Sequence, residues 1–277
     1  MKKICIITRI RNDEFFLKKW IKYYGSQVGE SNLFVYLDGM DQNISFDCGD
    51  VNIIKCERIA GHVVDAEKRR LKFLSDMAAI HLNNYDIIIG VDVDEFLVVD
   101  PKLNLSLPQY LSKKEINISL SGLGVDVGQH LEQEKIINDS QPFLEQRQFA
   151  VLSSRYTKPC VITKPVVWGS GFHRVKKHNF HIDENLFLFH FGCFDMQMLL
   201  DRFKDADRMK SGWERHIKKR TRTIDYVTKI KAKSGDKWMP IARLIQTYTR
   251  PIYAWNKPSM LFLTMVVSIP ERFRKTL

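Results

Sequence analysis

The apolar and polar residues of the first hundred positions alternate in a pattern that predicts strands and helices in turn. Four apolar runs have the length and composition of buried strands: 2–8, 32–38, 51–56 and 87–91. Two stretches between them, 13–27 and 65–83, carry apolar residues every third or fourth position, which is the spacing of amphipathic helices. This order predicts an α/β fold of the Rossmann-like kind, with a mainly parallel sheet and flanking helices. Asn12 is expected to cap the first helix.

Beyond residue 100 the pattern is less regular. Segments 116–123 and 149–153 are typical of short strands, and three glycines predict a loop nearby: Gly122, Gly124 and Gly128. Residues 158–195 are expected to form strands around two histidine-bearing segments. We therefore expect an α/β domain at residues 1–200, followed by a basic helical C-terminal extension at 201–277.

The net charge of +11 lies almost entirely in the C-terminal quarter. Residues 201–277 hold 19 Lys and Arg against 7 Asp and Glu, whereas residues 1–200 hold 24 against 25. Such a basic block indicates an anionic partner, either a membrane surface or a nucleic acid, although a merely solvated helical surface would have the same composition.

The five cysteines are scattered and show no C-x-x-C spacing, which argues against a disulfide framework or zinc site and favours a reducing, cytoplasmic location. The apolar start of the chain is interrupted at Thr8 and is too short for a signal peptide. No apolar run approaches the roughly 20 residues that a membrane span needs. A cytoplasmic protein, with an optional peripheral membrane contact, is therefore expected.

Three acidic residues follow directly on the fourth apolar run. Asp92, Asp94 and Glu95 lie within four positions, next to residues 87–91. Burying neighbouring carboxylates without compensation is costly, and a hard divalent cation such as Mn²⁺ or Mg²⁺ would compensate them. In an extended segment Asp92 and Asp94 would share one face. The alternative is that these acids are solvated or paired with Lys and Arg.

The ends of three strands are expected to meet at the same edge of the sheet. In a parallel sheet ligands bind beyond the carboxyl ends of the strands, which here carry Arg9 to Asn12, Asp38 to Asp41, and Asp92 to Glu95. These segments would assemble a nucleotide pocket. There is no G-x-G-x-x-G and no G-x-x-x-x-G-K-[ST], so dinucleotide and P-loop sites are disfavoured.

Several short motifs, in order along residues 1–200, resemble glycosyltransferases of family 92 and related family 2-like enzymes. They are Arg11-Asn12-Asp13-Glu14 with Leu17-x-x-Trp20-Ile21-x-Tyr23, Tyr36-Leu-Asp38-Gly39-x-Asp41, Asp92-Val-Asp94-Glu95-Phe96, Lys158-Pro159, Gly171-x-His173 and Leu188-Phe-His190-Phe. The resemblance implies a GT-A fold that transfers a sugar from a nucleotide donor, usually with a divalent metal. Asp13 stands where the family usually has Glu, which leaves open whether Asp13 or Glu14 faces the nucleotide.

Within this interpretation Asp94 is the expected direct metal ligand, and Asp92 contacts the donor ribose or supports the ion. His190 is the candidate for a third protein ligand, because it follows an apolar strand. A buried neutral histidine with a hydrogen-bond partner is the competing interpretation of His190.

Other polar residues are candidates for contacts with the nucleotide sugar. Asp38 or Asp41 would hold the nucleobase or ribose, unless they merely form a turn. Arg69 would reach the diphosphate, unless it lies on a charged solvent face, and His173 would contact substrate or phosphate, unless it is a surface loop residue. Four residues complete the expected donor-binding set: Arg9, Asn12, Asp13 and Asp92.

The catalytic base is the least determined element of the site. An inverting transfer needs a group that takes the proton from the acceptor hydroxyl, yet no Asp or Glu occurs between Gln146 and Ile182. The candidates are therefore Glu145, Asp126, Asp183 and Glu184, with His173 as a non-carboxylate option. A retaining mechanism, which needs no such base, stays open.

The sequence thus predicts a metal-dependent glycosyltransferase. It would transfer a sugar from a nucleotide-sugar donor, such as a UDP-sugar, to a glycan or lipid-linked saccharide acceptor in surface polysaccharide synthesis. The alternatives are a haloacid-dehalogenase-like phosphohydrolase and a protein that binds nucleic acid through its basic C-terminal region. As a glycosyltransferase, the protein is expected to have no nucleic-acid partner. The apolar run 260–269, flanked by Trp, Tyr and basic residues, would suit the surface of an anionic membrane. It would equally suit a core helix or an oligomer contact.

Overall fold

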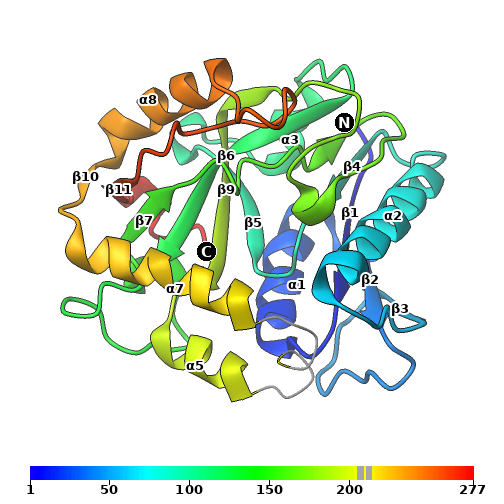
Figure 1. Ribbon diagram of the computed structural model, residues 1–277. Helices are drawn as coiled ribbons and strands as arrows, with labels where there is room; N and C mark the ends of the chain where they lie inside the picture. Colours follow the sequence, from blue (N-terminus) through cyan, green and yellow to red (C-terminus); the bar gives the residue numbers. More distant parts are fainter. Residues whose placement is uncertain (205–208, 210–213) are drawn as a thin grey trace.

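The computed structural model describes residues 1–204, 209 and 214–277 and shows an α/β fold (Figure 1). Its strands are β1 Ile4–Ile10, β2 Leu33–Asp38, β3 Asn52–Cys56, β4 Ile87–Gly90, β5 Glu95–Val99, β6 Ser119–Gly128, β7 Phe149–Leu152, β8 Val161–Ile162, β9 Ile182–Cys193, β10 Lys233–Ser234 and β11 Met265–Ser268. Its α-helices are α1 Glu14–Val28, α2 Val63–His81, α3 Leu107–Ser112, α4 Phe143–Gln146, α5 Met196–Lys204, α7 Glu214–Lys229 and α8 Gly235–Tyr248. The 3₁₀ turns are η1 Glu30–Asn32, η2 Pro101–Leu103, η3 Ser170–Phe172 and η4 Glu271–Phe273.

The strands form one mixed sheet with a parallel part and an antiparallel part. Its main path runs β10-β11-β7-β6-β8-β4-β1-β2-β3, while β9 pairs with both β5 and β6. The four strands β3, β2, β1 and β4 are parallel to one another, as the sequence predicts for the first hundred residues. Beyond β4 the sheet is mostly antiparallel, through β8, β6 and β7.

The two long helices cover opposite faces of the parallel strands, because successive residues of a strand point to opposite sides. On β1, Ile4 and Ile6 belong to a core cluster with Phe16, Trp20 and Tyr24 of α1. Another cluster takes the intervening strand residues and the apolar stripe of α2: Cys5, Ile7, Leu71, Leu74 and Ala78. This three-layer arrangement leaves the carboxyl edge of β1, β2 and β4 open to the loops that carry the polar residues (Figure 1).

The first helix begins one residue later than expected. Asn12 does not cap it; its backbone has a φ of 52°, in the left-handed region that Asn tolerates, and Asp13 is the N-cap residue. Asn12 therefore serves to turn the chain from β1 into α1.

The glycines expected in a loop lie within β6. A Cβ atom on Gly122 would come within 3.0 Å of the backbone nitrogen of Leu188 in the neighbouring strand β9. A Cβ atom on Gly124 would collide with the carbonyl oxygen of Ser153. The absence of side chains at these positions lets the backbones of β9 and of residues 153–157 approach β6 closely, so glycine is required here as it is in a tight turn.

The C-terminal residues pack on the same sheet instead of forming a purely helical extension. Strand β11, from the apolar run 260–269, pairs antiparallel with β7. Phe273 is fully buried in the main core, and the Arg272 guanidinium lies 2.7 Å from the Asp100 carboxylate. The run 260–269 is therefore neither a core helix nor wholly a surface segment: Met265 to Val267 are buried, while residues 261–263 are exposed. Within the described ranges, no helix has the length and apolar character needed to cross a bilayer.

Candidate functional site

Asp92 and Asp94 lie in a turn between β4 and β5, at the carboxyl edge of the parallel strands, and Glu95 is the first residue of β5. The turn is closed by a hydrogen bond from the Glu95 amide to the carbonyl oxygen of Asp92, 3.0 Å long. The expectation of one extended segment with Asp92 and Asp94 on a shared face is therefore wrong. The turn separates the acids, and each has different partners.

Asp92 is held by two basic side chains from distant parts of the sequence. Nη1 of Arg70 lies 2.8 Å from Oδ1, and Nζ of Lys158 lies 2.9 Å from Oδ2. Burial alone would raise the pKa of Asp92, but the charges of Arg70 and Lys158 lower it below its ordinary value. Asp92 is thus ionised and neutralised by protein groups, which is the alternative that the sequence left open for it.

Glu95 is completely buried and contacts the same lysine, Lys158. The pKa of Glu95 is raised to about 8, mainly by burial; the nearby Asp92 and Asp94 contribute to the rise, and Lys158 opposes it. A neutral Glu95 balances the charges of the group, because two anions (Asp92 and Glu67) then face two cations. Those cations are Arg70, which pairs with both Glu67 and Asp92, and Lys158, which pairs with Asp92.

Asp94 faces a different set of groups, centred on His190. Oδ2 of Asp94 lies 3.6 Å from Nε2 of His190, and both side chains are almost fully buried. A Cβ atom on Gly192 would come within 2.5 Å of His190 Nε2 and 3.1 Å of Asp94 Oδ2. Glycine at position 192 therefore keeps open the space that these two potential ligand atoms share.

His190 is fixed in place from its other side. Its Nδ1 lies 2.7 Å from Oδ1 of Asp126, its register partner on β6, and a carboxylate there accepts the Nδ1 proton. Thr223 of α7 donates to the second Asp126 oxygen over 2.6 Å, and the Tyr156 ring stacks on the imidazole at 3.7 Å. With Nδ1 protonated, the lone pair of Nε2 points to the Asp94 side, which is the arrangement of a metal-binding histidine with its carboxylate partner.

Arg202 of α5 brings a positive charge to the same place. Its Nη2 lies 3.8 Å from Asp94 Oδ2 and 3.3 Å from Asp13 Oδ2, and its Nη1 donates to the carbonyl oxygen of Gly192 over 2.9 Å. Asp13, rather than Glu14, thereby belongs to the group around Asp94. Glu14 instead accepts from Ser45.

Two of the three expected metal ligands are therefore side by side, and the third is not. In the part of the chain that the structure describes, no group of three or more His, Cys, Asp and Glu side chains is close enough to hold a metal ion alone. Asp94 and His190 fit a divalent cation that takes its remaining ligands from water and a diphosphate, since Mg²⁺-type ions commonly use one or two protein carboxylates plus substrate phosphates. Asp92, bound to Arg70 and Lys158, is not available to the same ion.

The residues expected at the nucleotide end are largely engaged with one another. Arg9 is buried, lies over the Phe73 ring at 4.4 Å, and donates to Asp38 over 2.7 Å. Asp38 also accepts the backbone amide of Ile59 over 2.8 Å. Asp41 is exposed and forms an ion pair of 2.8 Å with Arg11. These pairs shape the ends of β1 and β2.

Arg70, and not Arg69, reaches the acidic residues, and Arg69 follows the alternative of an exposed charged face. Arg69 is exposed and donates to the backbone carbonyl of Ala60, whereas Arg70 reaches Asp92. The helical pattern contains the signal that was missed: Arg70 directly precedes the buried Leu71, and Glu67 three positions earlier shares its face. Three further groups at the site were not expected from the sequence: Tyr156, Arg202 and Thr223.

His173 lies half-buried at the end of η3, in a positively charged environment. Burial lowers its pKa well below the ordinary value, and the charges of Lys158, Lys257 and Arg155 lower it further. His173 is therefore neutral at physiological pH. A region with several cations near Lys158 suits an anionic ligand better than a proton acceptor that must work beside them.

The candidates for a catalytic base lie apart from one another. Asp126 is buried behind His190 with both oxygens occupied. Glu145 is exposed on α4. Asp183, paired with Lys114, and the exposed Glu184 lie at the start of β9, roughly 20 Å along the strand from His190 at 3.3 Å per residue. The last two are therefore at the wrong end of β9 to act on a group at His190.

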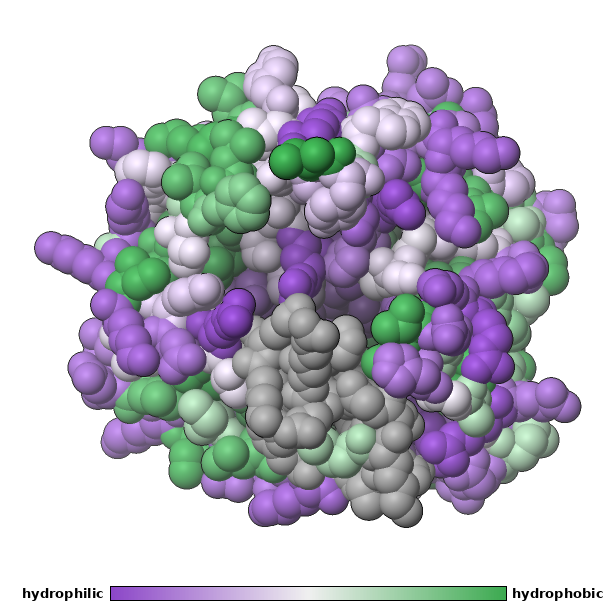
Figure 2. Space-filling model, in the orientation of Figure 1, coloured by the Kyte–Doolittle hydropathy of each residue, from purple (hydrophilic) through white to green (hydrophobic). Residues whose placement is uncertain are grey.

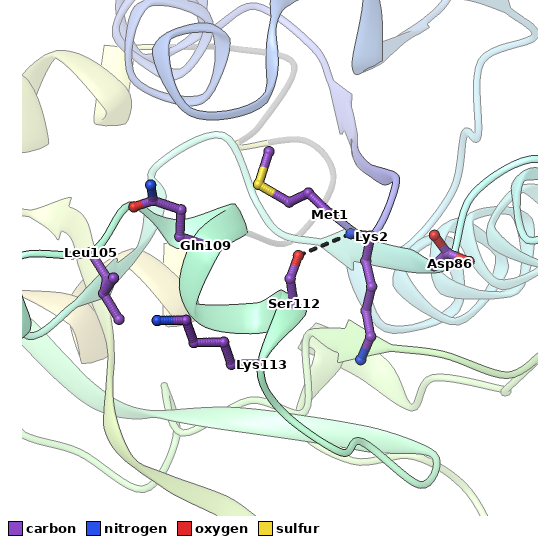
Figure 3. Close-up of a pocket in the computed structure, with 7 residues that line it drawn as sticks. All are labelled: Met1, Lys2, Asp86, Leu105, Gln109, Ser112 and Lys113. Atoms are coloured by element: carbon purple, nitrogen blue, oxygen red, sulfur yellow. Dashed lines mark hydrogen bonds between the residues drawn. The ribbon is translucent and has the colours of Figure 1, made fainter.

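A cavity of about 600 Å³ lies at the opposite edge of the sheet (Figure 3). Its lining includes the start of the chain, Asp86 before β4, and residues in α3 or next to it: Met1, Lys2, Asp86, Leu105, Gln109, Ser112 and Lys113. The amino ends of β1 and β4 border it, whereas the acidic residues follow the carboxyl end of β4. This cavity is separate from the candidate site.

No family model matches this chain, and no curated protein matches it. Among the solved structures that share some similarity with it are two enzymes. The first is a glycosyltransferase involved in the glycosylation of the major capsid of PBCV-1, with 14% identity over 44% of this chain and 50% of that chain, and a TM-score of 0.26. The second is CMP:2-keto-3-deoxy-manno-octonic acid synthetase complexed with CTP, with 12% identity over 78% and 84% of the two chains, and a TM-score of 0.32. Neither similarity is high enough to indicate a function.

Proposed function

We propose that this protein is a glycosyltransferase of the GT-A type that uses a nucleotide-sugar donor and a divalent cation, Mn²⁺ or Mg²⁺. The observation that carries the proposal is the pair formed by Asp94 and His190. Asp94 Oδ2 and His190 Nε2 lie 3.6 Å apart, with Gly192 leaving the space beside them open. The pair lies next to the carboxyl end of the parallel strand β4, where ligands of such sheets bind.

The chain's own residues would each act on a different part of the donor. Asp94 and His190 would hold the cation, and Asp126 would keep His190 in the ligating tautomer. The cations around His173, which include Lys158, Arg155 and Lys257, would attract the diphosphate. Asp38, presented by Arg9, would lie at the ribose or nucleobase, with Asn12 and Asp13 beside it.

The cation, when bound, offsets the negative charge that develops on the leaving nucleoside diphosphate. Arg202, beside Asp94 and Asp13, adds a second positive charge at this place. For an inverting transfer, the acceptor proton would go to a carboxylate or imidazole that faces the acceptor. Glu145 is the remaining candidate, because the two oxygens of Asp126 are already engaged, Asp183 and Glu184 lie at the far end of β9, and the cations around His173 suit the diphosphate instead.

The acceptor that we propose is a glycan or lipid-linked saccharide in surface polysaccharide synthesis, met on the cytoplasmic side of a membrane. The donor that we propose is a UDP-sugar. Both rest on the resemblance of the motifs and on the basic character of residues 201–277.

A phosphohydrolase of the haloacid-dehalogenase type is disfavoured by the surroundings of the first aspartate. Such an enzyme needs a carboxylate free to attack phosphorus. Asp92 instead has one oxygen bound to Arg70 and the other to Lys158.

The decisive experiment is a thermal-shift screen of nucleotide sugars with and without Mn²⁺, followed by an assay of donor hydrolysis. We expect one nucleotide sugar to raise the melting temperature only when the cation is present. Hydrolysis of p-nitrophenyl phosphate without any nucleotide-sugar binding would support the phosphohydrolase instead. Tight oligonucleotide binding with no effect of any nucleotide sugar would support a nucleic-acid-binding protein.

A further inference from the structure

Large apolar side chains gather on the surface of one C-terminal segment. Six of them form what we call the apolar tip: Ile252, Tyr253, Trp255, Leu261, Phe262 and Leu263. Ile252 and Phe262 are fully exposed, at 105% and 103%, so they make no burying contact with the rest of the chain. Apolar side chains cover the upper left of the face in Figure 2, over α8 and the region around it. Leu244 and Tyr248 of α8 are exposed as well.

The apolar tip is held outward by an ordered loop. Thr249 and Ser259 exchange two hydrogen bonds, of 3.2 and 2.7 Å, which close the loop between them. Within the loop Ala254 and Asn256 are buried, while their neighbours Tyr253 and Trp255 are exposed. The exposure of the aromatic rings is therefore fixed by the packing of the residues between them.

The second part of the apolar tip, residues 261–263, has a strained backbone. Leu261 and Phe262 have φ angles of 50° and 65°, in the left-handed region that residues with side chains rarely adopt. Such conformations persist only where the surroundings impose them. Buried residues flank this part, Met260 before it and Met265 after it, and they anchor both of its ends.

The segment that carries the apolar tip and the segment that it touches hold basic residues and no acidic ones. Residues 237–270 contain four Lys and Arg and no Asp or Glu, and residues 147–182 contain seven and none, of which Arg147 and Lys158 are buried. The two segments touch: Asn256 donates to the carbonyl oxygen of Val175 over 2.8 Å, and Arg250 lies over the Phe180 ring at 4.2 Å. Next to Val175, Lys176 and Lys177 are exposed.

We propose that the apolar tip inserts into the headgroup region of an anionic membrane, with the surrounding basic residues facing the lipid phosphates. Aromatic and aliphatic side chains beside lysines are the composition of an interfacial membrane contact. The basic charge around the apolar tip favours an anionic membrane over a second copy of this chain. A second copy of the chain would bring like charges together, whereas an anionic leaflet is complementary to them.

This surface also has a defined position relative to the candidate site. Val175, which anchors Asn256, is two residues from His173, and Lys257 follows Asn256 and contributes to the field at His173. A membrane bound at the apolar tip would therefore lie near the cationic side of the site. The delivery of a lipid-linked acceptor from that membrane rests on the proposed function, whereas the docking itself does not.

The test is flotation of the full-length protein with vesicles of phosphatidylcholine, with and without phosphatidylglycerol. We expect binding to the anionic vesicles that weakens when the salt concentration rises to about 0.5 M. The double variant Ile252→Ser/Phe262→Ser should bind about tenfold more weakly, since its protruding apolar groups are lost. The matched control is Ile80→Ser, which changes an exposed isoleucine on α2.

The charge contribution is tested by Lys176→Glu/Lys177→Glu against Lys18→Glu/Lys22→Glu, which reverses two exposed lysines of α1. Only the first pair should weaken binding. The proposal is overturned if the unaltered protein does not float with anionic vesicles, or if the Ile252→Ser/Phe262→Ser variant floats as well as it does. It is also overturned if sedimentation shows a dimer that this variant converts to monomers. Donor hydrolysis without vesicles is unaffected by the apolar-tip variant, so failure of docking and failure of the proposed function are separate results.

Discussion

Nδ1 of His190 lies 2.7 Å from Oδ1 of Asp126, its register partner on the neighbouring strand β6. The bond explains two features of the site at once. The bond gives one oxygen of the buried Asp126 carboxylate a hydrogen-bond partner. It also directs the lone pair of Nε2 to Asp94, whose Oδ2 lies 3.6 Å from Nε2. The histidine is thereby oriented to bind a cation through Nε2.

Replacing Asp126 with Asn should raise the metal concentration needed for activity by roughly 10- to 100-fold, the usual effect of losing the carboxylate partner of a metal-binding histidine. The measurement is donor hydrolysis as a function of Mn²⁺ concentration. Thr223→Val, which removes only the other hydrogen bond to Asp126, serves as the control and should have a smaller effect. An unchanged metal requirement in the folded Asp126→Asn variant would show that His190 is simply a core residue.

Glu95 should make the stability of the protein depend on pH above its ordinary titration range. Burial raises its pKa from 4.5 to about 8. A carboxyl with a raised pKa in the folded state stabilises fully below about pH 4.5, and this stabilisation is lost as the pH rises toward 8. The free energy of unfolding, measured in urea, should therefore fall over this window. The Glu95→Gln variant, which cannot ionise, should show a flatter profile; an identical profile for both proteins would refute the neutral Glu95.

Removing Lys158 should destabilise the fold strongly. Its side chain is almost fully buried between Asp92 and Glu95, and its loss leaves Asp92 with Arg70 alone. Breaking a buried ion pair from one side costs about 3 kcal/mol or more. Lys158→Met should lower the free energy of unfolding by this order. The exposed ion pair of Lys72 with Asp76 provides the contrast, since Lys72→Met should cost less than about 1 kcal/mol.

Arg70 and Arg69 offer a matched pair of substitutions on one helix. Arg70→Ala should weaken nucleotide-sugar binding and destabilise the acidic turn, because Arg70 neutralises Asp92 and Glu67. Arg69→Ala should have little effect on stability, because Arg69 is exposed and bonded only to a loop carbonyl. Calorimetric titration of the nucleotide sugar identified in the screen compares the two variants. Equal losses of affinity would mean that Arg69 reaches the diphosphate after all.

The first half of the fold could be predicted from apolar periodicity. Strands β1 to β4 and helices α1 and α2 lie within a few residues of their expected positions, because all of them except the edge strand β3 have a buried face. The glycines of β6 could not be interpreted in the same way. Their role is a close approach of backbones from β9 and the 153–157 segment, which depends on tertiary structure and leaves no periodic signal.

The candidate site could be predicted only in part. The acids Asp92 and Asp94, the histidine and the edge of the sheet could be located from the strand pattern. The alternation at 92–94 resembles a strand, however, and only the partners show that it is a turn. Those partners are Arg70, Lys158 and Arg202, which lie 22, 66 and 108 residues from the acids they approach. Pairings at such separations are set by the topology of the sheet, so local patterns do not reveal them.

The most direct test of the account is the metal dependence of donor turnover in an Asp94→Ala variant. The control is Asp41→Ala, which removes an exposed acid paired with Arg11 at the same edge of the sheet. We predict that chelation with EDTA abolishes hydrolysis by the unaltered protein. Asp94→Ala should lower Mn²⁺-dependent turnover by about 100-fold or more at unchanged thermal stability, because it removes a direct ligand of the cation. Full turnover by Asp94→Ala, or turnover by the unaltered protein that ignores EDTA, would contradict the account.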